Sequence, residues 1–201
     1  MSEINQAQTH TKKASGKKML LILALIFVLP FTVAATLHLL NIKPSGHSYG
    51  NLIQPPQALQ FPVLHDTQGK AFKHEQWLKK WSIVMIDSDG CAAACQEKVS
   101  MLKKVHVLLN KDAQRLQRVL LVPSDAKSEA IATLQKQAPD LLVLAGADAD
   151  TAKFAQAFNV AGAHVYLVDP FGNLMMSYPE KIDPSGIFGD LKRLLKNTLV
   201  G

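Results

Sequence analysis

The sequence predicts an α/β domain, in which a mixed sheet is flanked by helices, joined to one N-terminal helix that spans a membrane. Three observations lead to this prediction. A long apolar segment near the N-terminus carries no charge, and short apolar runs typical of buried strands alternate with helical segments from residue 61 onward. Near the C-terminus, a Gly-containing turn separates two further strand-like runs, which adds antiparallel strands to the sheet.

Residues 19–40 are predicted to form a transmembrane anchor. The segment contains no Asp, Glu, Lys or Arg, and about 20 apolar residues are enough for a helix to cross the hydrocarbon core. The charged residues that precede it are Glu3, Lys12, Lys13, Lys17 and Lys18. Because lysines before a span hold that end in the cytoplasm, we expect residues 1–18 to be cytoplasmic and the rest of the chain to emerge on the far side.

A cleaved signal peptide is the alternative, with Val33 and Ala35 as the small residues before a cut. Against it, apolar sequence continues as far as Leu40 and exceeds the apolar core of about 7–15 residues that signal peptides have. Both interpretations export the domain. We therefore expect an inner-membrane protein with one span, whose C-terminal domain faces the periplasm or an equivalent space.

Residues 43–60 are rich in Pro, Gly, Ser and Asn without periodicity, which predicts a linker, and the domain is predicted to occupy residues 61–201. The whole chain has 22 Lys and Arg against 16 Asp and Glu. Outside the N-terminal lysines these charges are scattered, with no basic stripe and no interleaved aromatic residues. Nucleic-acid binding is therefore not expected.

The order of predicted elements defines the fold class. Two short strands around a Gly-containing turn are expected within 61–72, and a short helical segment at 73–80. Strands are then predicted at 81–86, 118–122 and 141–144, helices at 92–109, 127–137 and 148–158, a hairpin at 164–169 and 174–178, and an amphipathic helix at 184–199. A hairpin, three strand–helix pairs, a second hairpin and a closing helix form a thioredoxin-like arrangement.

The two cysteines of the chain, Cys91 and Cys95, form a Cys-Ala-Ala-Ala-Cys motif between a buried strand and a helix. Free N–H groups and the helix dipole at such a position stabilise a thiolate, which is both the nucleophilic and the metal-binding form. A spacing of four residues places both side chains on one helix face with their α-carbons about 6 Å apart. That separation suits a disulfide or a soft metal ion, and the small alanines predict that both sulfurs are approachable.

A structural disulfide and a pair of inert buried thiols are the alternatives. A bridge that closes so short a loop removes little entropy from the unfolded chain, so it is a weak device for stability. Closely spaced cysteines in an exported protein are more typical of redox chemistry or metal binding.

From Phe61 onward the chain resembles the Sco/SenC family, which are membrane-anchored thioredoxin-fold proteins of cytochrome c oxidase copper-centre assembly. The matching segments are Gln68–Lys70, Trp81–Ile86, Cys91-x-x-x-Cys95, Val119–Asp125 and Tyr166–Gly172. The resemblance implies that Cys91 and Cys95 bind Cu(I) or exchange disulfides with the cysteines of the oxidase's copper site. In exchange, Cys91 would be the attacking thiolate and Cys95 the resolving one.

One departure from the family concerns its third copper ligand, a histidine in an Asp-His pair eight residues before the Asp of the Tyr-Leu-x-Asp segment. Counting back from Asp169 gives Ala161, preceded by Val160. His164 lies three residues later, about 10 Å further along an extended chain, and is the candidate replacement ligand. A second departure is Ala163, where ordinary thioredoxin-like reductases carry a proline that faces the cysteines.

Three functions remain open from the sequence. The first is a Sco-like assembly factor that binds Cu(I) or exchanges disulfides with a cytochrome c oxidase subunit at the membrane. The second is a general oxidoreductase for periplasmic thiol proteins without a metal, and the third is a non-catalytic thioredoxin-like binding protein. Copper is the one cofactor expected. His65, His74 and His106 lie in no motif and are predicted to be surface residues.

Overall fold

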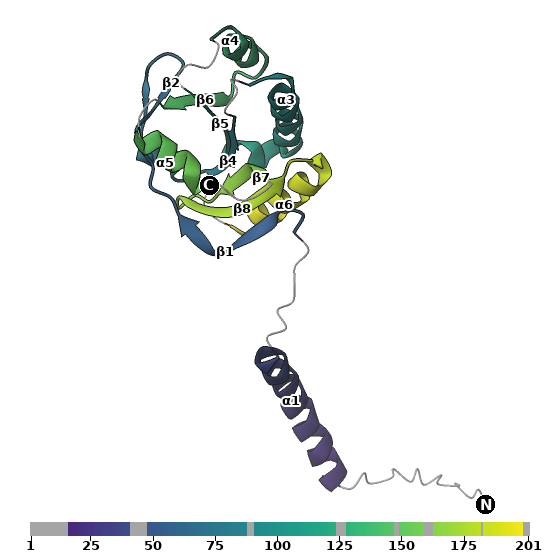
Figure 1. Cartoon of the computed structure of the whole chain (residues 1–201). Helices are drawn as coiled ribbons and strands as arrows, with labels where there is room; N and C mark the ends of the chain where they lie inside the picture. Colours follow the sequence, from purple (N-terminus) through teal and green to yellow (C-terminus); the bar gives the residue numbers. More distant parts are fainter. Residues whose placement is uncertain are drawn as a thin grey trace, which may run out of the picture. The chain divides into compact units, whose positions relative to one another are not determined.

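The computed structural model of the chain describes residues 16–40, 48–87, 91–123, 128–146, 149–158, 163–181 and 183–198. The chain divides into two compact units, residues 1–47 and 48–201. The first unit contains helix α1, Gly16–Leu39 (Figure 1). Its segment Gly16–Leu37 is long and apolar enough to cross a membrane, and none of it is buried inside the protein. The structure therefore confirms one N-terminal apolar helix with the composition of a membrane span.

The second unit contains an eight-stranded sheet with helices on both faces. The strands are β1 (Asn51–Ala58), β2 (Leu64–Asp66), β3 (Ala71–Phe72), β4 (Trp81–Ile86), β5 (Leu116–Pro123), β6 (Leu141–Gly146), β7 (Ala163–Val168) and β8 (Asn173–Pro179). The helices are α2 (His74–Trp77), α3 (Ala93–Leu108), the 3-10 helix η1 (Asn110–Arg115), α4 (Ser128–Gln137), α5 (Ala149–Ala157) and α6 (Pro184–Asn197).

The strands lie in the order β1-β8-β7-β4-β5-β6-β2-β3. Strands β4, β5 and β6 are parallel to one another, whereas β7 runs antiparallel to β4, β8 to β7 and β1 to β8. These directions bring the C-terminal ends of β4 and β8 and the N-terminal ends of β7 and β1 to one end of the sheet. The mixed sheet flanked by helices that the sequence predicts is confirmed, with both hairpins present.

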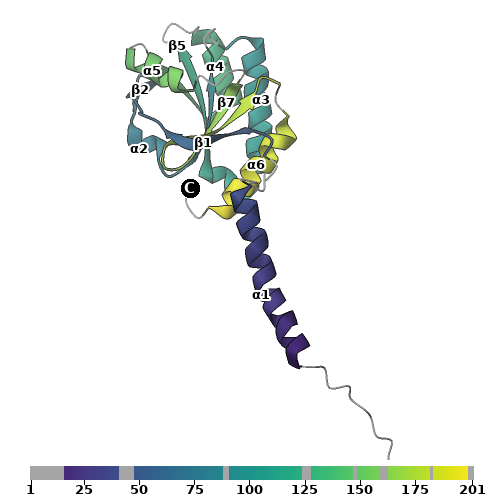
Figure 2. The same ribbon diagram turned by 60° about the horizontal axis from the view of Figure 1, so that its bottom comes forward.

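Two layers of helices cover the sheet (Figures 1 and 2). Helices α3, α4 and α6 lie on one face, and α2 and α5 on the other. Strand β4 explains why the sequence shows an apolar run, because its first five residues are buried and its apolar side chains are divided between the two cores. The first core contains Ile83, Val99, Leu102, Ile187 and Leu191, and the second contains Val84, Trp77, Phe154, Phe158 and Tyr166.

The linker predicted at 43–60 is shorter in the structure, because residues 51–58 form the edge strand β1. The strand carries Pro55 and Pro56 and is exposed along most of its length, so it has neither an apolar alternation nor a typical strand composition. Proline is tolerated at a sheet edge, where its missing N–H is not needed for pairing. The domain therefore begins near Ser48, and residues 43–47 of the predicted linker lie outside the described part of the chain.

A carboxylate on α6 attaches the start of the domain to its body. Asp190 is 4% exposed, and its two oxygens accept hydrogen bonds from the backbone N–H groups of Tyr49 (3.1 Å) and Gly50 (2.9 Å). The ring of Tyr49 also stacks on Tyr178, with 6.2 Å between ring centroids. The first residues of the domain are thus fixed at the end of the sheet where β1 begins.

The prediction that His106 is a surface residue is wrong. His106 lies on α3 and is only partly exposed. Its Nδ1 is 3.2 Å from the carboxylate of Asp140, which follows α4, and its Nε2 is 2.9 Å from the carbonyl oxygen of Ala113 in η1. Asp140 also accepts a 2.6 Å hydrogen bond from Arg118, whose side chain is completely buried. No local sequence pattern indicates this cluster, because its members are far apart along the chain.

Candidate redox site

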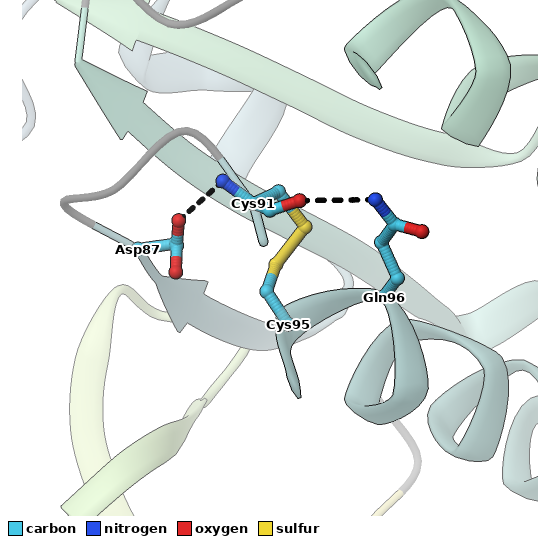
Figure 3. The surroundings of a disulfide bond; sticks show 4 residues. All are labelled: Asp87, Cys91, Cys95 and Gln96. Atoms are coloured by element: carbon cyan, nitrogen blue, oxygen red, sulfur yellow. Dashed lines mark hydrogen bonds between the residues drawn. A yellow bond between two sulfur atoms is a disulfide. The ribbon is translucent and has the colours of Figure 1, made fainter. Parts of the chain in front are cut away.

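The two cysteines lie where β4 passes into α3 (Figure 3). Cys91 precedes the helix by two residues and Cys95 lies in its first turn. Their sulfur atoms are joined in a disulfide, and the α-carbons are 5.0 Å apart. The predicted proximity of the two side chains is confirmed, and both cysteines of the chain are in this bond.

The N-terminus of α3 offers a positive electrostatic environment to the pair. The N-cap residue is Ala92, which has no side chain able to accept a hydrogen bond, and the first turn of the helix contains no acidic residue. The positive end of the helix dipole is therefore not offset by a capping carboxylate or hydroxyl. Once the disulfide is reduced, this end of the helix stabilises a thiolate at the cysteines.

Two side chains that the sequence analysis did not single out hold the backbone of Cys91. Asp87 follows β4, and its carboxylate accepts a hydrogen bond from the Cys91 N–H (Figure 3). Gln96, in the first turns of α3, donates from Nε2 to the Cys91 carbonyl oxygen at 3.2 Å. Cys91 itself has a φ of 60°, in the left-handed region that residues other than glycine rarely adopt.

Both cysteines are less accessible than the sequence predicts. Cys91 is 2% exposed and Cys95 is 8% exposed, and both belong to the core on the α3 and α6 face of the sheet. The expectation of two approachable sulfurs is therefore wrong for the disulfide-bonded form. The small alanines do not expose the pair, because long-range packing around α3 decides its burial.

His164, the candidate third metal ligand, lies near the start of β7 and is exposed. The pairing of β7 with β8 shifts register between Ala163 and Val165, so His164 sits at an irregularity of the sheet. Ala161 and Val160, the positions that match the family's ligand pair, lie outside the described residues. Ala163 is the first residue of β7 and pairs with Pro179.

The described residues do not fit a copper ion in this conformation. Within the described ranges, no group of three His, Cys, Asp or Glu side chains is placed to hold a metal ion. Cys91 and Cys95 are bonded to each other, so neither sulfur is a thiolate ligand. Cu(I) binding would require reduction of the disulfide, and His164 does not join the pair as found here.

A surface hollow of about 500 Å³ lies elsewhere, between the end of β1 and α5. Its lining includes Gln57, Gln60, Phe61, Lys153 and Phe154, and neither cysteine contributes to it. The chemistry of the cysteine pair therefore does not depend on this hollow.

Residues 81–198 match the family model described as "transmembrane-like, thioredoxin-like, C-terminal domain". No curated protein gives a significant sequence match. Many solved structures resemble the chain, among them copper-bound ScoI of Bradyrhizobium japonicum, with a TM-score of 0.55 and 21% identity over 68% of this chain and 99% of that one. At such identity the likeness shows a shared fold, which agrees with the resemblance found in the sequence.

Two further structural neighbours are a Sco protein and a thiol:disulfide interchange protein. BsSco, described as a member of the Sco family of cytochrome c oxidase assembly proteins with a disulfide switch, has a TM-score of 0.57 and 15% identity over 74% of this chain and 100% of its own. A thiol:disulfide interchange protein from Bacteroides sp. has a TM-score of 0.54 and 13% identity over 72% of this chain and 91% of its own. The thioredoxin-like fold is therefore common to both kinds of protein.

Proposed function

This chain belongs to the transmembrane-like, thioredoxin-like C-terminal domain family, and we propose that it is a membrane-anchored, Sco-like thiol–disulfide exchange protein that serves cytochrome c oxidase assembly. The observation that carries the proposal is the Cys91–Cys95 disulfide at a strand-to-helix junction, beside an uncapped helix N-terminus. The fold shared with BsSco and with an interchange protein supports the same chemistry.

Exchange at this site transfers two electrons between the cysteine pair and a client disulfide. In the reduced protein, the Cys91 thiolate attacks one sulfur of the client disulfide, and the client's other sulfur leaves as a thiolate that takes up a proton. The Cys95 thiol then loses its proton and attacks the Cys91 sulfur of the mixed disulfide. This step re-forms the Cys91–Cys95 bond and releases the client as a dithiol.

The burial of the pair limits the access of other thiols to its sulfur atoms. With 2% and 8% of the two cysteines exposed, an incoming thiolate reaches a sulfur only after the covering side chains move aside. Access controls the rate of exchange, together with the acidity of the thiols. We therefore propose that oxidised Cys91–Cys95 reacts slowly with bulky thiols unless a client binds beside α3.

The location that we propose is the inner membrane, with residues 1–18 in the cytoplasm and the domain in the periplasm. The seven residues between Leu40 and Ser48 span at most about 28 Å when fully extended. Strand β1 begins at the same end of the sheet where β4 ends and the cysteines follow. A domain tethered to the membrane by so few residues favours a client held in the same membrane, as an oxidase subunit is.

Cu(I) binding by the reduced pair is the second candidate function. Its support is the copper-bound ScoI structure, which shares the fold with this chain. Copper would then be a cargo for delivery to the oxidase, with Cys91 and Cys95 as thiolate ligands and His164 as the proposed third. A general oxidoreductase without a metal and a non-catalytic binding protein remain the alternatives outside oxidase assembly.

Two measurements on the full-length chain in detergent micelles test these candidates. The first follows reduction of a peptide that carries a Cys-x-x-x-Cys disulfide by the pre-reduced protein, with Cys91→Ser as the control. Transfer of two electrons per protein supports exchange, and no transfer by the wild-type protein refutes it.

The second measurement is an anaerobic titration of the reduced protein with Cu(I). Stoichiometric binding with a Kd below about 1 μM, lost in Cys91→Ser, favours copper handling, and unchanged affinity in His164→Ala ends the role of that ligand.

A further inference from the structure

Asp87 is connected to the redox pair through the backbone of Cys91. Its carboxylate oxygen Oδ2 accepts a hydrogen bond from the Cys91 N–H, and Figure 3 shows this carboxylate beside the disulfide. Asp87 is itself fixed to the sheet, because its N–H donates to the Leu121 carbonyl oxygen on β5 at 3.0 Å. The backbone that carries this carboxylate is thus held by the neighbouring strand β5.

The conformation of Cys91 needs such support. A φ of 60° places the residue in the left-handed region, where a side chain other than glycine costs about 1–3 kcal/mol unless the surroundings enforce it. Three interactions enforce it here. Asp87 holds the N–H, Gln96 holds the carbonyl oxygen, and the disulfide holds the side chain. Removing the Asp87 carboxylate leaves the disulfide-bonded conformation with one fewer constraint.

The negative charge of Asp87 also favours the disulfide over the reduced pair. A carboxylate bonded to the backbone N–H of a cysteine lies within about 7 Å of that cysteine's sulfur by covalent geometry alone. A disulfide carries no charge, whereas a reduced pair with one thiolate carries a negative charge that the carboxylate repels. The helix N-terminus favours the thiolate, so Asp87 opposes the effect of α3 at Cys91.

We propose that Asp87 is a positioning residue that sets the redox equilibrium of the Cys91–Cys95 pair toward the disulfide. It does so by holding Cys91 in its left-handed conformation and by opposing a thiolate at its sulfur. The proposal rests on the redox function proposed above and states in which direction electrons pass between this protein and its clients. A pair shifted toward the disulfide gives up electrons readily once it is reduced, so the protein acts on clients as a reductant.

Equilibrium with dithiothreitol and glutathione tests this assignment on the full-length chain in micelles, with thiol alkylation and mass spectrometry as the readout. Conversion of the disulfide to one thiol and one thiolate, the form whose charge Asp87 opposes, takes two electrons and one proton from the reductant, which is itself oxidised to a disulfide. A unit charge within 7 Å of a sulfur alters such an equilibrium more than tenfold at a protein-like dielectric. Asp87 is partly exposed, so solvent weakens its effect. We expect Asp87→Asn to shift the equilibrium constant about tenfold in favour of the reduced form, which corresponds to a change of about 30 mV in the reduction potential.

Asp87→Asn keeps an oxygen acceptor for the Cys91 N–H, whereas Asp87→Ala removes both the acceptor and the charge. We therefore expect Asp87→Ala to shift the equilibrium at least as far as Asp87→Asn. Glu97→Gln is the matched control, because it removes an exposed carboxylate from α3 two residues after Cys95, and it is expected to change the equilibrium less than threefold. In the reduced Asp87→Asn protein, alkylation of Cys91 should also reach half its maximal rate at a lower pH than in wild type.

The outcomes separate the two proposals. If wild type is reduced and exchanges with clients but Asp87→Asn shifts neither its equilibrium nor its alkylation profile, the role of Asp87 is refuted and the proposed function stands. If dithiothreitol does not reduce wild type, the proposed function fails. The role of Asp87 then survives only if Asp87→Asn makes the disulfide reducible, and it falls with the function if that variant also resists.

Discussion

The buried arginine behind α3 allows a sharp prediction about stability. The side chain of Arg118 is 0% exposed, and its strongest contact is the 2.6 Å hydrogen bond to Asp140, whose side chain is 45% exposed. Its side chain also donates a 3.5 Å hydrogen bond to the Val99 carbonyl oxygen, and its Nε has no partner among the residues that the structure describes. Asp140→Ala therefore leaves a buried positive charge almost without compensation, whereas Arg118→Met leaves a carboxylate that water already reaches.

For this reason we expect Asp140→Ala to lower the free energy of unfolding more than Arg118→Met does. Removal of one partner from a fully buried pair costs about 3–5 kcal/mol, and the exposure of Asp140 reduces that to about 2 kcal/mol. For a domain of this size, 2 kcal/mol lowers Tm by about 4–8 °C. Arg118→Met replaces a desolvated charge by an apolar side chain of similar length, so we expect a change of less than about 1 kcal/mol in either direction.

Thermal unfolding of the full-length protein in micelles, followed by circular dichroism, measures both changes. Burial raises the pKa of Asp140, but the hydrogen bond and charge of Arg118, with a smaller contribution from His106, lower it further, so the net pKa is below the usual 3.8. A carboxyl whose pKa is lower in the folded state stabilises the protein above pH 3.8 and loses that effect as the pH falls through the folded pKa. The difference in Tm between wild type and Asp140→Asn should therefore shrink below pH 3.8. An equal or larger loss in Arg118→Met than in Asp140→Ala would refute this reasoning.

Three further changes have definite expected outcomes in the same assay. Asp190→Ala removes the acceptor of one buried and one partly buried backbone N–H group and should cost about 1–3 kcal/mol, and an unchanged Tm would contradict its role at the start of the domain. Gly50→Ala places a Cβ 2.6 Å from the Tyr178 ring and should cost about 1–3 kcal/mol, so a stabilised variant would show that the ring moves freely. The double change of Cys91 and Cys95 to Ser should cost only about 2 kcal/mol, because the disulfide closes a short loop, and a loss above 4 kcal/mol would favour a purely structural bridge.

Several parts of the fold were predictable because they depend on local pattern. The apolar run Trp81–Ile86 indicates a strand covered on both faces, and β4 is that strand. The Gly172 turn indicates the β7–β8 hairpin, and its φ of 86° is one that glycine adopts without strain. The proximity of Cys91 and Cys95 follows from their spacing at a helix start, so the sequence alone predicts that the two sulfurs are close enough for a disulfide.

Other features depend on contacts that the sequence does not display. Strand β1 has the composition of a linker, because Pro55 and Pro56 are acceptable only at the sheet edge that it occupies. Arg118 opens an apolar run and looks like a surface residue, but Asp140 neutralises it inside the protein. Asp87 belongs to a polar loop whose charge gives no indication of which N–H it accepts. The burial of both sulfurs is likewise decided by packing between elements distant in sequence.

The reduction potential of the Cys91–Cys95 pair in the full-length protein tests the central claim most directly. Exchange-active pairs in proteins have potentials from about −120 to −270 mV, whereas structural disulfides of exported proteins lie below about −300 mV. We predict a reversible two-electron potential above −300 mV, toward the reducing end of the exchange-active range. A disulfide that stays oxidised at −300 mV and below would contradict the account and identify the bridge as structural.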